Sequence, residues 1–310
     1  MNRNFLTSCF RIFLTAAIAG GMASTLHAED VKPEVKFAEV NGVKLAYYTR
    51  GQGRPLLMIN GYLSSMSLWD PALLADLEKT HTLILFDNRG VGLSTDTAEN
   101  NTTIPQMADD AAALIGALQL DKPDVLAWSM GARIGQQLAI RHPQVLNKIV
   151  LVSADPGGTH NDPATTEVES TLNNPAVEKM KKIYLTYPDN DAGRQAAQQT
   201  LARLEAAVKD GSVPDDFDVS KQTIERQNRA RTTLWEGNDD NYNALKTIAL
   251  PMLVTAGKDD IIDPPKNAAI IAGQVPFAWT AYFEGGHAFL FQSHARFSAA
   301  VDVFLADQGQ

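Results

Sequence analysis

The sequence predicts an α/β fold with a mostly parallel sheet of eight strands, flanked by helices, and an inserted helical lid. Short apolar runs rich in Val, Ile and Leu recur along the chain without polar alternation, as in strands buried on both faces. Helical patterns separate most of these runs, and that order is typical of a parallel sheet. One long stretch, residues 156–245, breaks the alternation with helical patterns only.

A β-hairpin is expected to begin the sheet. Residues 37–40 and 43–48 are strand-like and flank Asn41-Gly42, a dipeptide that favours a tight hairpin turn. Six further strands are then expected at residues 56–59, 83–86, 125–128, 149–152, 252–256 and 279–283.

Helix starts are marked by capping residues. Asp70-Pro71 has the pattern of an N-cap followed by proline in the first turn. Thr103 and Gln106 have the spacing of a capping box, and the apolar residues that follow recur at helical intervals. Another helix is expected at 130–141.

The insertion at residues 156–245 contains helical patterns around 175–186, 192–209 and 221–235. An insertion of this size between two core strands is expected to form a lid over the carboxyl ends of the strands, where such sheets bind ligands. The core would then comprise residues 29–155 and 246–310.

Composition and charge exclude several classes of protein. The chain has 310 residues, of which 45% are apolar and 20% charged, as in ordinary globular proteins and unlike disordered or fibrous ones. It carries 36 acidic and 27 basic residues, a formal charge of −9, which repels phosphate backbones. We therefore expect no nucleic acid partner.

Residues 1–28 have the pattern of a signal peptide. Arg3 and Arg11 form a basic start, and residues 12–23 are apolar but too short to span a membrane. Cleavage is expected after Ala28, with Ala23 as the alternative. The protein is therefore predicted to be exported, periplasmic or secreted, with no stable membrane span after cleavage.

Signal cleavage would also remove Cys9, the single cysteine of the chain. The mature protein would then have no thiol, which suits an oxidising compartment and excludes cysteine catalysis and thiolate metal sites.

A candidate nucleophile, Ser129, lies between a predicted strand and a predicted helix. Such a turn strains the serine backbone, so the residues two before and two after it must be small, and they are Ala127 and Gly131. The helix N-terminus supplies free N–H groups and a positive dipole end, which stabilise developing negative charge. Ser129 is therefore a candidate for nucleophilic catalysis.

These residues resemble motifs of the α/β-hydrolase superfamily. Residues 127–131 resemble its nucleophile elbow, with Ala127 in place of the first glycine. Four other segments resemble family motifs in the family's order: residues 60–62, 87–94, 257–264 and 285–287. The resemblance implies the α/β-hydrolase fold and a serine hydrolase of the esterase-like branch.

A serine nucleophile needs a base, and a neutral histidine suits that role near pH 7. His287 follows two glycines after a predicted core strand and is the candidate base. Of the other histidines of the mature chain, His81 and His142 are expected to be structural, while His160 lies at the edge of the predicted lid and His294 in the last predicted helix.

The acid of the triad orients the imidazole and stabilises its charged form. The Gly-x-x-Asp motif of the family, when it is aligned on Gly257, implies Asp260 as this acid, with Asp259 as the alternative in the same loop. Asp263 and Asp259 are interpreted as solvated loop carboxylates, and Asp155 is an outside candidate because some members place the acid after the preceding strand.

An oxyanion hole needs two positioned N–H donors. Met130 follows the nucleophile, and Tyr62 occupies the position of the family's second donor. Asn60 stands where the family usually has histidine. Tyr184, Tyr187 and Trp235 are candidates for an acyl pocket, although packing between helices is the commoner role of such residues.

The expected function is that of an exported serine hydrolase acting on carboxylic ester or related acyl bonds of a small molecule. Alternatives with the same triad are a carbon–carbon bond hydrolase and a cofactor-free perhydrolase, and a non-catalytic binding protein is the alternative of another class. No metal or cofactor is expected, because histidine pairs near a carboxylate and phosphate-binding Gly-Lys-Ser/Thr motifs are missing. Acyl length and oligomeric state stay open.

Overall fold

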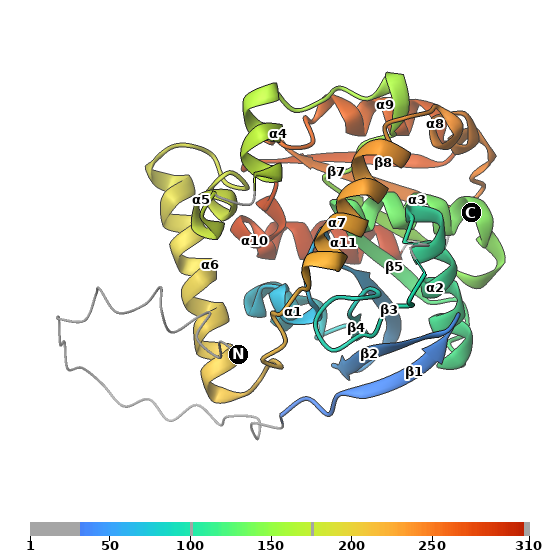
Figure 1. Ribbon diagram of the computed structural model, residues 1–310, viewed down its shortest axis with the longest axis vertical. Helices are drawn as coiled ribbons and strands as arrows, with labels where there is room; N and C mark the ends of the chain where they lie inside the picture. Colours follow the sequence, from blue (N-terminus) through green and yellow to red (C-terminus); the bar gives the residue numbers. More distant parts are fainter. Residues whose placement is uncertain (1–31, 100–101, 175–176, 307–310) are drawn as a thin grey trace.

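The computed structural model describes residues 32–99, 102–174 and 177–306. The predicted signal peptide, with Cys9, lies outside these residues. Figure 1 shows a central twisted sheet with helices on both faces and a set of helices at one end.

The sheet has eight strands in the order β1-β2-β4-β3-β5-β6-β7-β8. All pairs from β4 to β8 are parallel, and only β2 runs against its neighbours. The predicted mostly parallel sheet is therefore confirmed, with strands at Lys36–Val40, Val43–Arg50, Arg54–Ile59, His81–Phe86, Asp124–Trp128, Ile149–Val152, Met252–Gly257 and Ala278–Phe283 for β1 to β8.

Both faces of the central strands are buried, which explains their unbroken apolar sequence. In β3, Leu57 and Ile59 pack in one hydrophobic cluster, while Leu56 and Met58 pack in another on the opposite face. The first cluster includes side chains from α2 (Ile104–Ala117), α3 (Met130–Arg141) and α9 (Lys266–Gln274). The second includes side chains from α1 (Pro71–Leu77), α10 (Phe289–Gln292) and α11 (His294–Ala306). The molecule is thus built in three layers.

The helices begin largely where their caps predict. The Asp70 carboxylate accepts a hydrogen bond from Ala72 N, and Thr103 Oγ1 accepts one from Gln106 N. The predicted capping box is half formed, because the Gln106 side chain donates to Asp110 instead. The helices α1 to α11 span Pro71–Leu77, Ile104–Ala117, Met130–Arg141, Thr166–Asn173, Lys179–Tyr184, Asp191–Asp210, Lys221–Arg229, Asp240–Ala244, Lys266–Gln274, Phe289–Gln292 and His294–Ala306.

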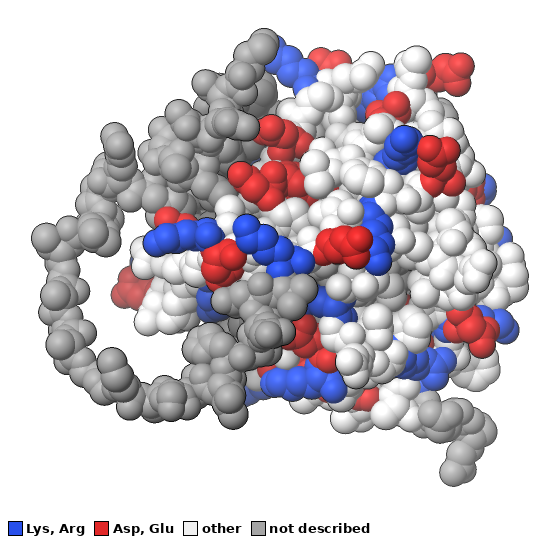
Figure 2. Space-filling model, turned by 90° about the horizontal axis from the view of Figure 1, so that it is seen from below, with Lys and Arg blue, Asp and Glu red and all other residues white. Residues whose placement is uncertain are grey.

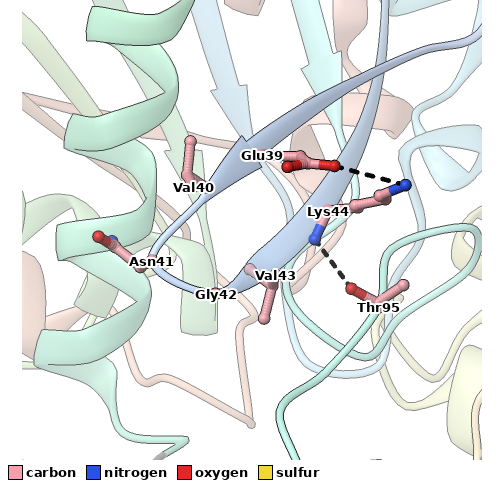
Figure 3. Close-up of a pocket in the computed structure, with 7 residues that line it drawn as sticks. All are labelled: Glu39, Val40, Asn41, Gly42, Val43, Lys44 and Thr95. Carbon is pink, nitrogen blue, oxygen red and sulfur yellow. Dashed lines mark hydrogen bonds and ion pairs between the residues drawn. The ribbon is translucent and has the colours of Figure 1, made fainter.

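The hairpin turn at Asn41-Gly42 has positive φ at both residues, 47° and 78°, as a tight hairpin turn requires. Beside it lies a hollow of about 400 Å³, lined by residues 39–44 and Thr95 (Figure 3). This hollow is at the β1 edge, with three strands between β1 and β5, so it does not adjoin Ser129. Its lining includes no candidate site residue.

Helices α4 to α8 lie between β6 and β7, within the insertion. In Figure 1, α6 runs along the side of the molecule next to α1, and α7 crosses in front of the sheet. The predicted helix at 221–235 differs from the structure, because α7 ends at Arg229 and one π-helical turn, Ala230–Leu234, follows.

Ionic contacts dock the insertion on the core. Arg203 of α6 pairs with Asp70 at 2.5 Å, and Arg226 of α7 pairs with Asp96 at 2.7 Å. Asp216, after α6, is buried close to Asp87, and burial together with the charge of Asp216 raises the pKa of Asp87 to about 8. At neutral pH this carboxyl pair therefore holds a proton.

The surface carries both signs of charge. On the face drawn in Figure 2, basic and acidic side chains are interspersed, without a large area of one sign. Within the described ranges, no helix is both long and apolar enough to cross a membrane.

Gly131 is a position where the fold tolerates no side chain. A Cβ there would lie 2.2 Å from the carbonyl oxygen of Ile59, so the start of α3 would have to move away from β3. We expect Gly131→Ala to destabilise the protein by about 1–3 kcal/mol, measured by urea unfolding.

The matched control is Gly273→Ala in α9, where an added Cβ would meet no atom within 4 Å. Because alanine favours helix more than glycine does, this substitution should raise stability by up to about 1 kcal/mol. Equal effects of the two substitutions would contradict the packing argument.

Candidate functional site

Ser129 occupies the sharp turn between β5 and α3. Its φ of 58° and ψ of −126° are unusual for a residue with a side chain, as the predicted elbow requires. The turn is held by Ser129 N, which donates to Val152 O at 2.9 Å, and by Ser129 O, which accepts from Ala132 N at 2.7 Å. Trp128 and Met130 are buried, whereas Ser129 is partly exposed. The hydroxyl is therefore presented at the carboxyl edge of the sheet.

The loop after β3 lies directly against this serine. A Cβ on Gly61 would be 3.1 Å from Ser129 Cβ and 3.5 Å from Ser129 Oγ. Asn60 is fully buried, where its side chain donates to Ser65 O and accepts from Gly61 N, at 2.7 and 2.8 Å. Asn60 thus shapes the loop by its own hydrogen bonds.

Two N–H groups are free to receive negative charge here. Met130 is the first residue of α3, so its N–H has no intrahelical acceptor. Among the residues that the structure describes, no hydrogen bond engages the N–H of Met130 or of Tyr62. The two candidate oxyanion donors are therefore unused N–H groups of residues next to the serine turn, since Met130 follows Ser129 and Tyr62 follows Gly61, which lies against it.

His287 and Asp260 are in contact. Nδ1 of His287 lies 3.0 Å from Oδ2 and 3.2 Å from Oδ1 of Asp260, and both side chains are buried. Asp260 Oδ1 also accepts hydrogen bonds from the N–H groups of Ile262 and Asp263, each at 2.9 Å. The carboxylate is therefore fixed by its own loop in the orientation that meets the imidazole.

The His287 loop is attached to the end of β5. The indole of Trp128 donates to His287 O at 3.0 Å, and Ser153 Oγ donates to the same oxygen at 3.2 Å. The His287 ring lies 5.6 Å from the Trp128 ring, centroid to centroid. Among the hydrogen bonds of the described residues, the His287 ring bonds to Asp260 and not to Ser129 Oγ; in serine–histidine pairs this contact often tightens only when a substrate binds.

The other acids of this region differ in their surroundings. Asp259 is exposed and does not reach His287. The interpretation of Asp263 as a solvated carboxylate is wrong: it is 5% exposed and lies 3.5 Å from Arg133 Nη2. Asp155 also pairs with Arg133, at 2.5 Å, so it neutralises an arginine and does not orient the base.

Burial and neighbouring charges shift the protonation of these groups. Burial, together with the charge of Asp155, raises the pKa of Asp263 to about 7. Burial alone would lower the pKa of the His287 imidazole, but the charge and hydrogen bond of Asp260 raise it above its ordinary value. The base is therefore tuned chiefly by its bonded carboxylate.

Two arginines that the sequence analysis did not single out, Arg133 and Arg231, lie close to the candidate site residues. Arg231 lies over the Tyr62 ring, with its guanidinium carbon 4.8 Å from the ring centre, and its backbone carbonyl accepts from Arg133 Nη1 at 2.9 Å. The sequence carries no signal for these contacts, because Arg133 and Arg231 are far apart in the chain and have no motif in common.

The aromatic candidates have separate roles. The Trp235 indole donates to Asp155 at 2.7 Å, which ties the insertion to the site. Tyr187 is buried in the hydrophobic cluster on the α1 face, and Tyr184 packs against that cluster. Packing therefore accounts for the two tyrosines.

The remaining described histidines have structural partners. His142 pairs with Asp109 and His294 with Asp76, each at 2.6 Å, while His160 stacks on Tyr242. His81 is buried, with Nδ1 2.8 Å from Thr80 Oγ1. Within the described ranges, no three histidine, cysteine or acidic side chains form a cluster suited to a metal ion.

Comparison with known proteins finds the alpha/beta hydrolase fold family and relatives that are named as hydrolases. The family model described as alpha/beta hydrolase fold matches residues 54–293. A Caulobacter protein named "Putative carbamate hydrolase RutD" is 28% identical over 82% of this chain and 91% of its own length. The 2-hydroxymuconate semialdehyde hydrolase of a Pseudomonas strain is 25% identical over 86% of this chain and 92% of its own length.

Among solved structures, an alpha/beta hydrolase fold protein from Chitinophaga pinensis superimposes with a TM-score of 0.77 at 25% identity. The match covers 90% of this chain and 100% of that protein.

The geometry distinguishes Asp260 from Asp259. Asp260→Asn should lower the rate of reaction of the serine with a fluorophosphonate by about ten-thousandfold, as loss of the triad acid does in other serine enzymes. Asp259→Asn, one residue away and exposed, should react within about twofold of the unmodified protein. A larger loss in Asp259→Asn than in Asp260→Asn would show that the acid is misassigned.

Proposed function

Because the chain belongs to the alpha/beta hydrolase fold family, we propose that it is an exported serine hydrolase that cleaves carboxylic ester or related acyl bonds of a small molecule. One observation carries this proposal: a serine in a strained strand-to-helix turn directly follows Trp128, whose indole is bonded to the loop of a buried, hydrogen-bonded His–Asp pair. Such an arrangement serves nucleophilic catalysis by serine.

In the proposed reaction, His287 takes the proton of Ser129 Oγ as the oxygen attacks the substrate carbonyl. The negative charge that develops on the carbonyl oxygen is stabilised by the N–H groups of Tyr62 and Met130. His287 then donates its proton to the leaving alcohol, and an acyl-enzyme forms on Ser129. Water activated by His287 releases the acid and restores the serine.

Asp260 keeps the imidazole in the tautomer that accepts the serine proton. Its hydrogen bond to Nδ1 leaves Nε2 as the acceptor, and its charge stabilises the imidazolium that forms after proton transfer. Because Asp260 is buried, water does not screen this charge.

A second candidate is hydrolysis of a 2-hydroxymuconate semialdehyde-like compound, the activity named for the Pseudomonas relative. The same triad would serve it, so the two candidates differ in substrate and share Ser129. A panel of esters graded by acyl length, tested beside that semialdehyde, distinguishes them.

Covalent labelling tests the proposed nucleophile. A fluorophosphonate should label the purified protein once per chain, and peptide mapping should place the label on Ser129, because an activated serine beside an oxyanion hole reacts with this reagent. Ser129→Ala should abolish labelling and lower ester hydrolysis by about a millionfold.

His287→Ala serves as the control that separates activation from accessibility, since it leaves Ser129 in place. If the unmodified protein is folded and takes no label, the alternative of a non-catalytic binding protein would be favoured. That protein should keep its ligand affinity after Ser129→Ala.

Export is proposed from the sequence of residues 1–28. When the full chain is expressed in a Gram-negative host, the periplasmic fraction should contain a protein whose first residue is Glu29, or Ser24 if cleavage follows Ala23. N-terminal sequencing and intact mass measure this directly. Full-length protein retained in the cytoplasm would contradict the proposal.

A further inference from the structure

A second set of buried charges lies behind the catalytic base, and the reaction described above does not use it. Arg133 of α3 has Nε 2.5 Å from Asp155 Oδ2 and Nη2 3.5 Å from Asp263 Oδ1. None of the three residues is more than 6% exposed. Burying three charged groups carries a desolvation cost that apolar side chains of similar volume would avoid. Stability alone therefore does not account for this cluster.

Asp263 also faces the base. Its Oδ2 lies 3.9 Å from His287 Nδ1, the nitrogen that Asp260 contacts at 3.0 Å. The N–H of Asp263 donates to Asp260 Oδ1, so one turn of chain holds both carboxyl groups against one side of the imidazole. A negative charge at this distance in a buried site favours the protonated imidazole.

We propose that Asp263 is a positioning residue of the triad, a second carboxylate that is held by Arg133 and stabilises the protonated form of His287. The inference rests on the proposed function in one respect, that His287 acts as the base. It adds that the charge state of Asp263 affects His287: when Asp263 is ionised, His287 binds its proton more tightly.

The charges around Asp263 act on its carboxyl group in opposite directions. Arg133, from α3, attracts the ionised carboxylate, while Asp155, after β6, pairs with Arg133 and offsets its charge. Glu169 of α4 and Glu236, after the π-helical turn, act on Arg133 from farther away. With Asp155 and Arg133 neutralising each other, ionisation of Asp263 places a second negative charge beside Asp260.

The direct test is a pH titration of the His287 imidazole by NMR in ¹⁵N-histidine-labelled protein, with the signal assigned from a His287→Gln variant. In the unmodified protein the curve should show two steps, because Asp263, with its pKa of about 7, titrates beside the ring. In Asp263→Asn the curve should have one step, with its midpoint at lower pH. This titration needs no substrate.

Asp259→Asn is the matched control, because it removes an exposed carboxylate from the same loop. It should reproduce the two-step curve of the unmodified protein. Circular dichroism establishes that each variant is folded, and the curve of the unmodified protein tests the inference even if Asp263→Asn does not fold.

The pH dependence of fluorophosphonate labelling gives a second readout. In Asp263→Asn the acidic limb should move to lower pH, while the plateau at alkaline pH should fall by about three- to tenfold because the base is weaker. A uniform loss at all pH values, with an unchanged His287 midpoint, would mean that Asp263 is only structural and would overturn the inference.

The two proposals can fail separately. If the unmodified protein is not labelled but Asp263→Asn lowers the His287 midpoint, the proposed function fails while the coupling of Asp263 to His287 stands. If labelling occurs on Ser129 and the His287 curve shows one step in both proteins, the function stands and this inference is wrong.

Discussion

The backbone turn at Ser129 is the constraint on which the rest of the site depends. A residue with a side chain at a φ of 58° is held there at a cost of about 1–3 kcal/mol, so the surroundings must enforce the conformation. Hydrogen bonds to Val152 and Ala132 do so, and Gly131 lets α3 start in contact with the backbone of β3. In the same packing, Gly61, the residue before Tyr62, lies next to the serine hydroxyl. The candidate nucleophile and the loop of a candidate oxyanion donor are therefore positioned by one packing arrangement.

The candidate base is attached to this turn by separate contacts. The loop that carries His287 follows β8, at the far edge of the sheet from β1, and it is joined to the ends of β5 and β6 by hydrogen bonds from Trp128 and Ser153, respectively. The insertion also contacts this loop, since Ala288 N donates to Thr186 O at 2.8 Å. A displacement of the insertion would thus move contacts of the His287 loop as well as the Arg231 side chain that covers Tyr62.

The buried charges have a common organisation. Asp155 receives a hydrogen bond from Trp235 of the insertion and pairs with Arg133 of the core, and Arg133 in turn approaches Asp263 beside the base. Arg133 also donates to the carbonyl of Arg231. One arginine, four residues after the nucleophile, therefore links α3, the insertion and the loop of the triad acid. In a low-dielectric interior such contacts are strong and sensitive to geometry.

Much of the architecture follows from the sequence alone. Each of the eight strands lies within about two residues of its predicted place, because a strand buried on both faces must be apolar throughout. The Ser129 turn was also predictable, since small residues at 127 and 131 are a local requirement of its geometry. His287 stood out among the histidines for the same local reason, the glycines before it.

Folding decided what lies around these residues. Whether a loop carboxylate is solvated or buried depends on which distant segments cover it, and local sequence does not record that. Asp263 therefore looked like its exposed neighbour Asp259, although Arg133 and the His287 loop bury it. Arg133 and Arg231 were missed for the same reason, because their partners lie tens of residues away. The backbone turn at Ser129 requires particular residues next to it in the sequence, so it could be predicted. The electrostatic surroundings of His287 arise only where α3, the loop after β7 with Asp260 and Asp263, and the insertion come together in the folded protein.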